Sequence, residues 1–70
     1  MKRKIVKNIK LSSFHAGSRL DIVIAKEYPE YSRTHIKKWI EKGFLTLDGK
    51  QVKPRTKIMG NEIVEIRAEE

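Results

Sequence analysis

The absence of cysteine from a chain of only 70 residues is the feature that most constrains how this sequence can fold. Neither disulfide bonds nor thiolate metal ligands can reinforce the structure, and the two histidines, His15 and His35, lie far apart in the sequence. A chain of this size buries only about 60% of the surface that its unfolded form exposes. We therefore expect one small domain that folds by apolar packing alone, with no metal and no other cofactor.

The net charge of the chain indicates a polyanionic partner. Lys and Arg together number 16 and Asp and Glu number 9, which gives a net charge of +7. Between Arg33 and Lys57 eight residues are basic, and the only acidic residues are Glu41 and Asp48. A basic helix face alone is usually solvated surface, but here the positive charge continues beyond the helix, which favours an anion-binding site.

The sequence has no feature that indicates a membrane or a secreted protein. No apolar run approaches the length of a membrane span, and the basic start MKRKIVKNIK is not followed by the apolar segment of a secretory signal. A basic segment with so weak an apolar face also gives little support to a lipid-surface adaptor. We therefore expect a cytoplasmic protein without a membrane partner.

Residues 1–17 form a basic N-terminal segment in which apolar and polar residues alternate imperfectly. Ile5, Ile9 and Leu11 would share one face of an extended strand, and this pattern predicts an edge strand. A frayed basic arm is the alternative.

A first helix is predicted to begin at Ser18 and to end near Glu27. Ser18 and Asp21 have the spacing of a capping box, in which each side chain accepts a hydrogen bond from the other residue's backbone N–H group. Pro29 disfavours helical geometry at the residue before it, so the helix should end before that point.

A second helix is predicted from the N-cap Ser32 to Gly43, a residue type that suits the left-handed conformation often found after a helix. Tyr31, directly before the cap, is placed to pack on Ile36 as a hydrophobic staple. Three apolar residues recur at helical spacing and predict the buried stripe of this helix: Ile36, Trp39 and Ile40.

The C-terminal third of the sequence predicts strands. FLTLDGKQV has the pattern of a hairpin with Asp48 and Gly49 as a two-residue turn, which would pair Leu45 with Val52. EIVEIR, residues 62–67, predicts a last strand. The predicted architecture is an α+β domain in which two helices pack on a small, mostly antiparallel sheet.

Independent catalysis is not expected of this chain. Asp21 and Asp48, the only aspartates, have structural roles in a capping box and a turn, and no nucleotide-binding or zinc-binding motif occurs. His35 is interpreted as a surface residue or a ligand contact rather than a general base. Trp39 is interpreted as a core residue, and Phe44 as a packing residue with stacking on a base as the alternative.

The start of the second helix is the candidate binding site. Its free backbone N–H groups and its dipole favour an anion, and four side chains there could hold phosphate oxygens: Ser32, Arg33, Thr34 and Lys37. N-capping is the favoured role for Ser32, and binding is the favoured role for Arg33. Arg19, at the start of the first helix, either joins this patch or pairs with a nearby glutamate, and its spacing leaves both alternatives open.

The segment SRLDIVIAKEYPEYSRTHIKKWIEKGFLTLDGKQVKP resembles the S4 RNA-binding domain. The resemblance covers residues 18–67 and rests on R-L-D opening one helix, S-R opening the next, and D-G-K in the hairpin. EYPEYSRTHIKKWIEKG is most similar to the N-terminal S4 domain of ribosomal large-subunit pseudouridine synthases of the D-like class. Residues 68–70 would then be a tail or a linker to an absent domain.

This resemblance implies that RNA contacts come from the start of the second helix and the adjoining loop. Together with two lysines of the predicted hairpin, the predicted RNA-binding residues are Arg19, Ser32, Arg33, Thr34, Lys37, Lys38, Lys50 and Lys53. The catalytic aspartate of such synthases lies in a separate domain, within a motif that continues with polar residues. Asp21 is followed by Ile22 instead, so Asp21 is not expected to be that residue.

We therefore predict a monomeric module that binds structured RNA, expected to be ribosomal RNA, through phosphate contacts, and that has no small-molecule ligand. It would recruit RNA for a pseudouridine synthase, an isomerase whose catalytic domain is not in this chain, so the chain alone would not be an enzyme. A stand-alone S4-type or ribosome-associated protein is the alternative. A helix-turn-helix DNA binder is disfavoured, because the second helix lacks Asn or Gln for reading adenine.

Overall fold

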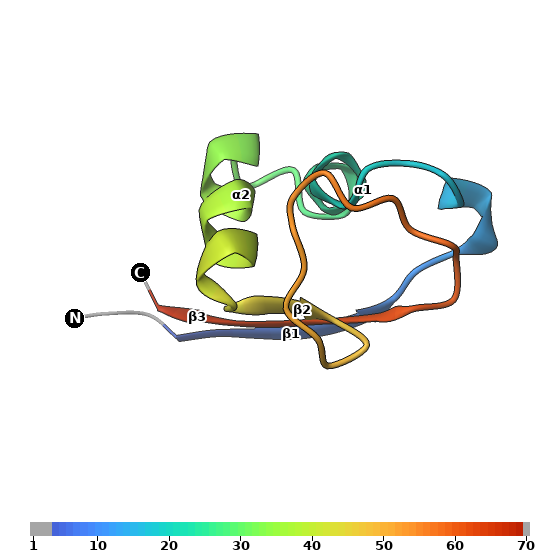
Figure 1. Cartoon of the computed structure of the whole chain (residues 1–70). Helices are drawn as coiled ribbons and strands as arrows, with labels where there is room; N and C mark the ends of the chain where they lie inside the picture. Colours follow the sequence, from blue (N-terminus) through green and yellow to red (C-terminus); the bar gives the residue numbers. More distant parts are fainter. Residues whose placement is uncertain (1–3, 70) are drawn as a thin grey trace.

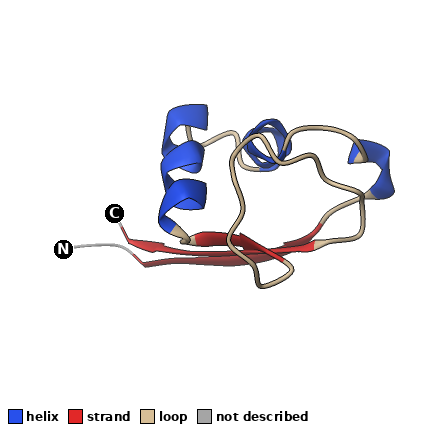
Figure 2. Cartoon of the chain, viewed as in Figure 1, coloured by secondary structure: helices blue, strands red, loops and turns tan. Residues whose placement is uncertain are grey.

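Two helices pack on one face of a three-stranded antiparallel sheet in the computed structural model of the chain, which describes residues 4–69 (Figures 1 and 2). The strands are β1 Lys4–Lys10, β2 Leu45–Leu47 and β3 Ile63–Glu69, and the two helices are α1 Leu20–Glu27 and α2 Arg33–Lys42. A short 3-10 helix, η1 Ser13–His15, lies between β1 and α1. The strand order is β1-β3-β2, so the last strand in the sequence is the central one. The predicted α+β architecture is confirmed, and so is the edge strand predicted for the N-terminal segment.

Two observations at the ends of the chain bear on the predicted domain limits. Residues 1–3 of the basic segment predicted over 1–17 lie outside the described residues, as does Glu70. β3 continues to Glu69, past the domain limit predicted at residue 67, and Ala68 in this extension is buried opposite Ile5 of β1.

The core lies between the helices and the sheet. The largest fully buried side chains come from both helices, from β2 and β3, and from the loop before β3: Leu20, Ile24, Ile36, Ile40, Leu45, Ile58 and Ile66. Neither α1 nor α2 covers the other face of the sheet, where Val6 and Ile63 are exposed (Figure 1). The apolar stripes predicted from periodicity therefore meet in a single layer of packing.

The start of α1 differs from the prediction. The helix begins at Leu20, so the capping box predicted for Ser18 and Asp21 is wrong. The loop before β3 satisfies the first backbone groups instead, because the Leu20 N–H donates to the Thr56 carbonyl at 2.8 Å and the Asp21 N–H to the Pro54 carbonyl at 3.2 Å. This loop therefore closes the α1 N-terminus and is fixed in place by it.

The two-residue turn at Asp48 and Gly49 is confirmed. Both residues have positive φ angles, 51° and 76°, as a type I′ turn requires. The Asp48 carboxylate also accepts a hydrogen bond from the Ile63 N–H at 2.9 Å, which ties the turn to the start of β3.

The pairing of Leu45 with Val52 predicted for this hairpin is wrong. Leu45 pairs with Ile66 of β3, and the returning segment contributes no strand to the sheet. Gln51 turns away from β2 and donates from its side-chain nitrogen to the Glu41 carbonyl at the end of α2, at 2.8 Å. The returning chain therefore leaves the sheet and runs along the helices.

The predicted features of α2 are confirmed in most respects. The Ser32 hydroxyl accepts from the His35 N–H at 3.1 Å, and Gly43 is left-handed with a φ angle of 80°. Three residues form the buried stripe: Ile36, Trp39 and Ile40. The ring of Tyr31 packs on Trp39 with a centroid distance of 4.9 Å, and the staple contact with Ile36 stays a prediction.

A first prediction concerns Gly60, which lets the loop before β3 approach η1. Gly60 has a φ angle of 101°, and a Cβ atom there would lie 2.7 Å from the Cα atom of Ser13. Gly60→Ala should therefore lower the free energy of unfolding by about 2–3 kcal/mol in urea denaturation. Gly17→Ala is the control, because Gly17 has a φ angle of 86° but nothing within 4 Å of the added Cβ, so only about 1 kcal/mol should be lost. Equal losses would contradict the steric argument.

Candidate nucleic-acid interface

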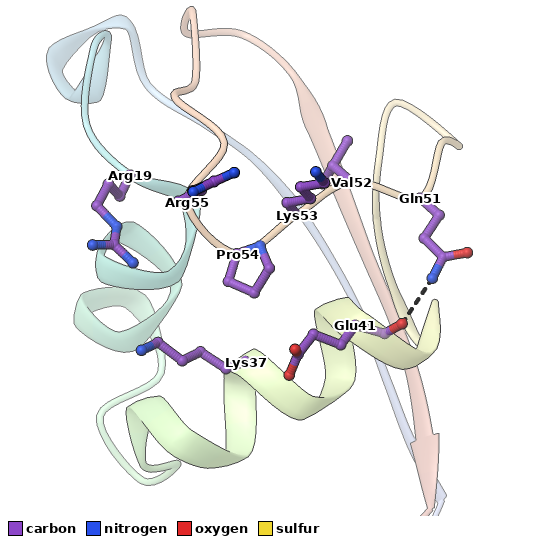
Figure 3. Close-up of a pocket in the computed structure, with 8 residues that line it drawn as sticks. All are labelled: Arg19, Lys37, Glu41, Gln51, Val52, Lys53, Pro54 and Arg55. Carbon is purple, nitrogen blue, oxygen red and sulfur yellow. Dashed lines mark hydrogen bonds between the residues drawn. The ribbon is translucent and has the colours of Figure 1, made fainter.

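A groove of about 740 Å³ opens where the start of α1, one face of α2 and the loop between β2 and β3 meet (Figure 3). This is the loop described above as the loop before β3. Its lining residues are Arg19, Lys37, Glu41, Gln51, Val52, Lys53, Pro54 and Arg55. Four of these residues are basic and one is acidic. The groove therefore carries an excess of positive charge, and a concave surface of this kind favours anions.

The loop positions two of the basic residues of the groove. The segment from Lys53 to Thr56 is a closed turn, in which the Lys53 N–H donates to the Thr56 hydroxyl at 3.2 Å and the Thr56 N–H donates to the Lys53 carbonyl at 3.0 Å. The carbonyls of Pro54 and Thr56 accept from the start of α1, as described above. The backbone of Lys53 and Arg55 is thus fixed relative to α1.

One face of α2 supplies the opposite wall of the groove. Lys37 and Glu41 are four residues apart and therefore lie on the same helix face. The Lys37 side chain extends from α2 toward α1, and the hydrogen bond from Gln51 to the Glu41 carbonyl closes the end of the groove near β2 (Figure 3). The groove therefore has basic groups on three sides, from α1, α2 and the loop.

A buried carboxylate joins the starts of the two helices beside this groove. Asp21 is fully buried, and its two oxygens accept from the Arg19 guanidinium, with Nε–Oδ1 at 3.2 Å and Nη2–Oδ2 at 3.0 Å. Nη2 of Arg33 lies 3.7 Å from the same Oδ2 atom. Of the two alternatives left open for Arg19, the ion pair is formed with Asp21 and not with a glutamate, and the Arg19 side chain also lines the groove; its membership of the binding patch stays a prediction.

The predicted binding residues fall into two groups on different sides of α2. Arg19, Lys37 and Lys53 line the groove. Arg33 is linked to it by an ion pair with Asp21, which also binds Arg19. A second, separate hollow has a lining of Ser32, Thr34, His35, Lys38, Trp39, Lys42, Phe44 and Glu69. Neighbouring helical residues point about 100° apart, so side chains adjacent in sequence, such as those of residues 37 and 38, reach different surfaces.

Two basic residues stand apart from the predicted grouping. Lys50 directly follows the turn at the hairpin tip and lines neither the groove nor the hollow. Arg55 lines the groove although it was not among the predicted binding residues. Its position one residue after Pro54 and two after Lys53 was the available signal, since a turn brings such residues onto one surface.

The residues with alternative roles are placed as follows. Trp39 is only 3% exposed, so its interpretation as a core residue is confirmed. Phe44 is 40% exposed, and His35 is partly buried with its ring 4.8 Å from that of Trp39.

Within residues 4–69 no three His, Asp or Glu side chains gather as metal ligands would, and no helix is long and apolar enough to span a membrane.

A small basic α+β domain with a cationic groove has the features expected of a nucleic-acid-binding module. The family model of the S4 domain matches residues 18–64, and the chain belongs to the S4 domain family, a family of RNA-binding domains. This confirms the resemblance found in the sequence.

Similar proteins include three that are named ribosomal large subunit pseudouridine synthase D. The protein of Vibrio vulnificus strain CMCP6 is 46% identical over 54 residues, which are 76% of this chain and 17% of the relative. Those of Vibrio parahaemolyticus and Escherichia coli K12 are each 37% identical over 70 residues, 99% of this chain and 22% of the relative. The chain thus spans about a fifth of the length of these relatives, and the part of it that the family model matches, residues 18–64, is an S4 domain.

Proposed function

We propose that this domain binds structured ribosomal RNA by placing the phosphates of a folded RNA segment in the groove between α1, α2 and the loop. The observation that supports this most is the convergence of Arg19, Lys37, Lys53 and Arg55 from three separate elements on one concave surface. Double-stranded RNA is recognised mostly by its shape and through phosphate and 2′-hydroxyl contacts, so a basic surface of fixed shape suits it. Recognition would therefore depend on shape and phosphate position more than on base sequence.

The start of α2 adds to this proposal. The first backbone N–H groups of a helix have no partner within the helix, and the dipole is positive at that end. The Ser32 hydroxyl is used to cap the His35 N–H, so we assign Ser32 to capping and Arg33 to phosphate binding. Thr34, Lys38 and Lys50 are proposed as outer contacts of a longer RNA that extends beyond the groove.

The names of the relatives suggest the wider role. We infer that the domain recruits ribosomal RNA to a pseudouridine synthase, whose catalysis would come from a domain other than this one. Asp21 takes no part in that reaction, because its carboxylate is fully buried and is bound to arginines. A cytoplasmic location goes with this proposal, since ribosomal RNA would be the substrate.

The proposal is tested by measuring affinity for a folded ribosomal RNA fragment and for duplex DNA over a range of salt concentrations. The domain should prefer the RNA, and the logarithm of the binding constant should fall linearly with the logarithm of salt concentration. Arg33→Ala with Lys37→Ala should reduce the salt slope by about two, one for each phosphate that the variant no longer binds. Preference for duplex DNA would favour the helix-turn-helix alternative, and unchanged RNA binding by the double variant would exclude the proposed site.

A further inference from the structure

The buried carboxylate of Asp21 is fully used by its neighbours. Oδ1 accepts from the Arg19 Nε at 3.2 Å and from the Ile22 N–H at 2.9 Å, while Oδ2 accepts from the Arg19 Nη2 at 3.0 Å. Arg33 Nη2 completes the set as an ion pair at 3.7 Å from Oδ2. A carboxylate offers about four acceptor positions, so three of those of Asp21 are filled by hydrogen bonds, and Arg33 adds an ion pair.

The backbone of Asp21 is fixed as firmly as its side chain. Its N–H donates to the Pro54 carbonyl at 3.2 Å, which joins α1 to the loop that carries Lys53 and Arg55. Asp21 therefore contacts all three elements that surround the groove: its own helix, the start of α2 and the loop.

The side chains of Arg19 and Arg33 are partly exposed and can still bind a ligand. Their side chains are 42% and 54% exposed, for Arg19 and Arg33 respectively, although the carboxylate between them is fully buried. A guanidinium has five N–H donors, and the two hydrogen bonds of Arg19 to Asp21 leave others for a ligand. Two arginines at this spacing would repel each other, and the carboxylate offsets that repulsion.

We propose that Asp21 is a positioning residue that holds Arg19 and Arg33 together as a paired site for one phosphate group of the RNA backbone. This inference rests on the proposed function and assigns a defined ligand to one part of the site. Arginine pairs bind phosphate well when their planar groups are oriented in advance, because little side-chain freedom is then lost on binding.

Asp21→Asn distinguishes positioning of the arginines from simple charge attraction, because the two explanations predict opposite changes in RNA affinity. The amide oxygen can still accept from the Ile22 N–H, but the amide nitrogen that replaces Oδ2 cannot accept from either guanidinium. Net charge rises by one from +7, so attraction alone predicts tighter RNA binding. Positioning predicts weaker binding, by about 10-fold, with the salt slope reduced by about one.

Asp48→Asn is the matched control. It makes the same change of charge, asparagine tolerates the positive φ angle of 51° at this turn, and its oxygen can keep the bond from the Ile63 N–H. This variant should bind RNA as tightly as the unmodified domain or slightly more tightly. Circular dichroism and thermal melting should show that both variants are folded.

A second variant keeps the inference testable if Asp21→Asn does not fold. Arg19→Lys preserves the charge but replaces the two-point contact with a single ammonium group, so positioning again predicts about 10-fold weaker binding. Attraction alone predicts no change. If the unmodified domain binds RNA with a steep salt dependence while Asp21→Asn binds equally or more tightly, the positioning role is wrong and the proposed function stands. If the unmodified domain does not bind structured RNA, the proposed function itself fails.

Discussion

Replacing Lys37 and Arg55 together by glutamate should lower the affinity for structured RNA by about 100-fold or more. Both side chains line the groove, one from α2 and the other from the loop. A hydrogen bond to a charged group contributes about 1.5–3 kcal/mol, so removing two such bonds to phosphate costs at least about 3 kcal/mol of binding free energy. Fluorescence anisotropy with a labelled ribosomal RNA fragment at fixed salt would measure the change.

The matched control is the replacement of Lys38 and Lys42 by glutamate on the other side of α2. Both residues line the hollow, and the double change alters the net charge of +7 by the same four units. This variant should bind less than about 10-fold more weakly. Long-range attraction changes equally in both variants, but the control loses only the outer contact proposed for Lys38, whereas the first variant loses two contacts in the groove. Equal effects would mean that overall charge governs binding, and a larger effect in the control would move the site to the hollow.

The sequence predicted most reliably those features that depend on neighbouring residues. The cap at Ser32, the left-handed Gly43 and the turn at Asp48 each depend on a few adjacent residues, and all three are confirmed. The same local reasoning failed at Ser18, because the Pro54 carbonyl, from a distant part of the chain, accepts the Asp21 N–H that Ser18 was predicted to cap. Long-range competition of this kind leaves no local signal.

The hairpin prediction failed for a related reason. A two-residue turn between apolar segments normally joins two paired strands, but here the pairing across the turn stops after the bridge between Leu47 and Lys50, and β2 forms its ladder with β3. The returning segment is then drawn to the helices by the bond of Gln51 to the end of α2. Because the returning segment runs along the helices, it brings Lys53 and Arg55 to the starts of the helices. This segment therefore forms one side of the groove instead of a strand.

The candidate site was predicted in its residue types but not in its arrangement. The excess of basic residues after Arg33 is visible in composition, whereas the separation of Lys37 from Lys38 requires the orientation of α2 on the sheet. Asp21 was assigned to a cap because its spacing from Ser18 fits one. Its actual partners, Arg19 and Arg33, are brought together only by the packing of α1 on α2.

Trp39→Ala should remove about half of the stability of this domain. Trp39 is 3% exposed and packs against the rings of Tyr31 and His35 at centroid distances of 4.9 and 4.8 Å. Truncation of a buried tryptophan costs about 3–5 kcal/mol, whereas a domain of this size has only about 4–10 kcal/mol of stability in total. Urea denaturation followed by circular dichroism should show a large fall in the midpoint, and a small change would contradict the core role.

Phe44→Ala is the companion change, and it also decides the role of a partly exposed aromatic residue beside the hollow. Phe44 is 40% exposed, so its truncation should cost only about 1 kcal/mol of stability and leave the domain folded. If Phe44 only packs on the protein, RNA affinity should change by less than about 3-fold. Stacking on a base contributes about 1–3 kcal/mol, so a decrease of about 10-fold or more in the folded variant would show that Phe44 stacks on RNA and that the hollow belongs to the binding surface.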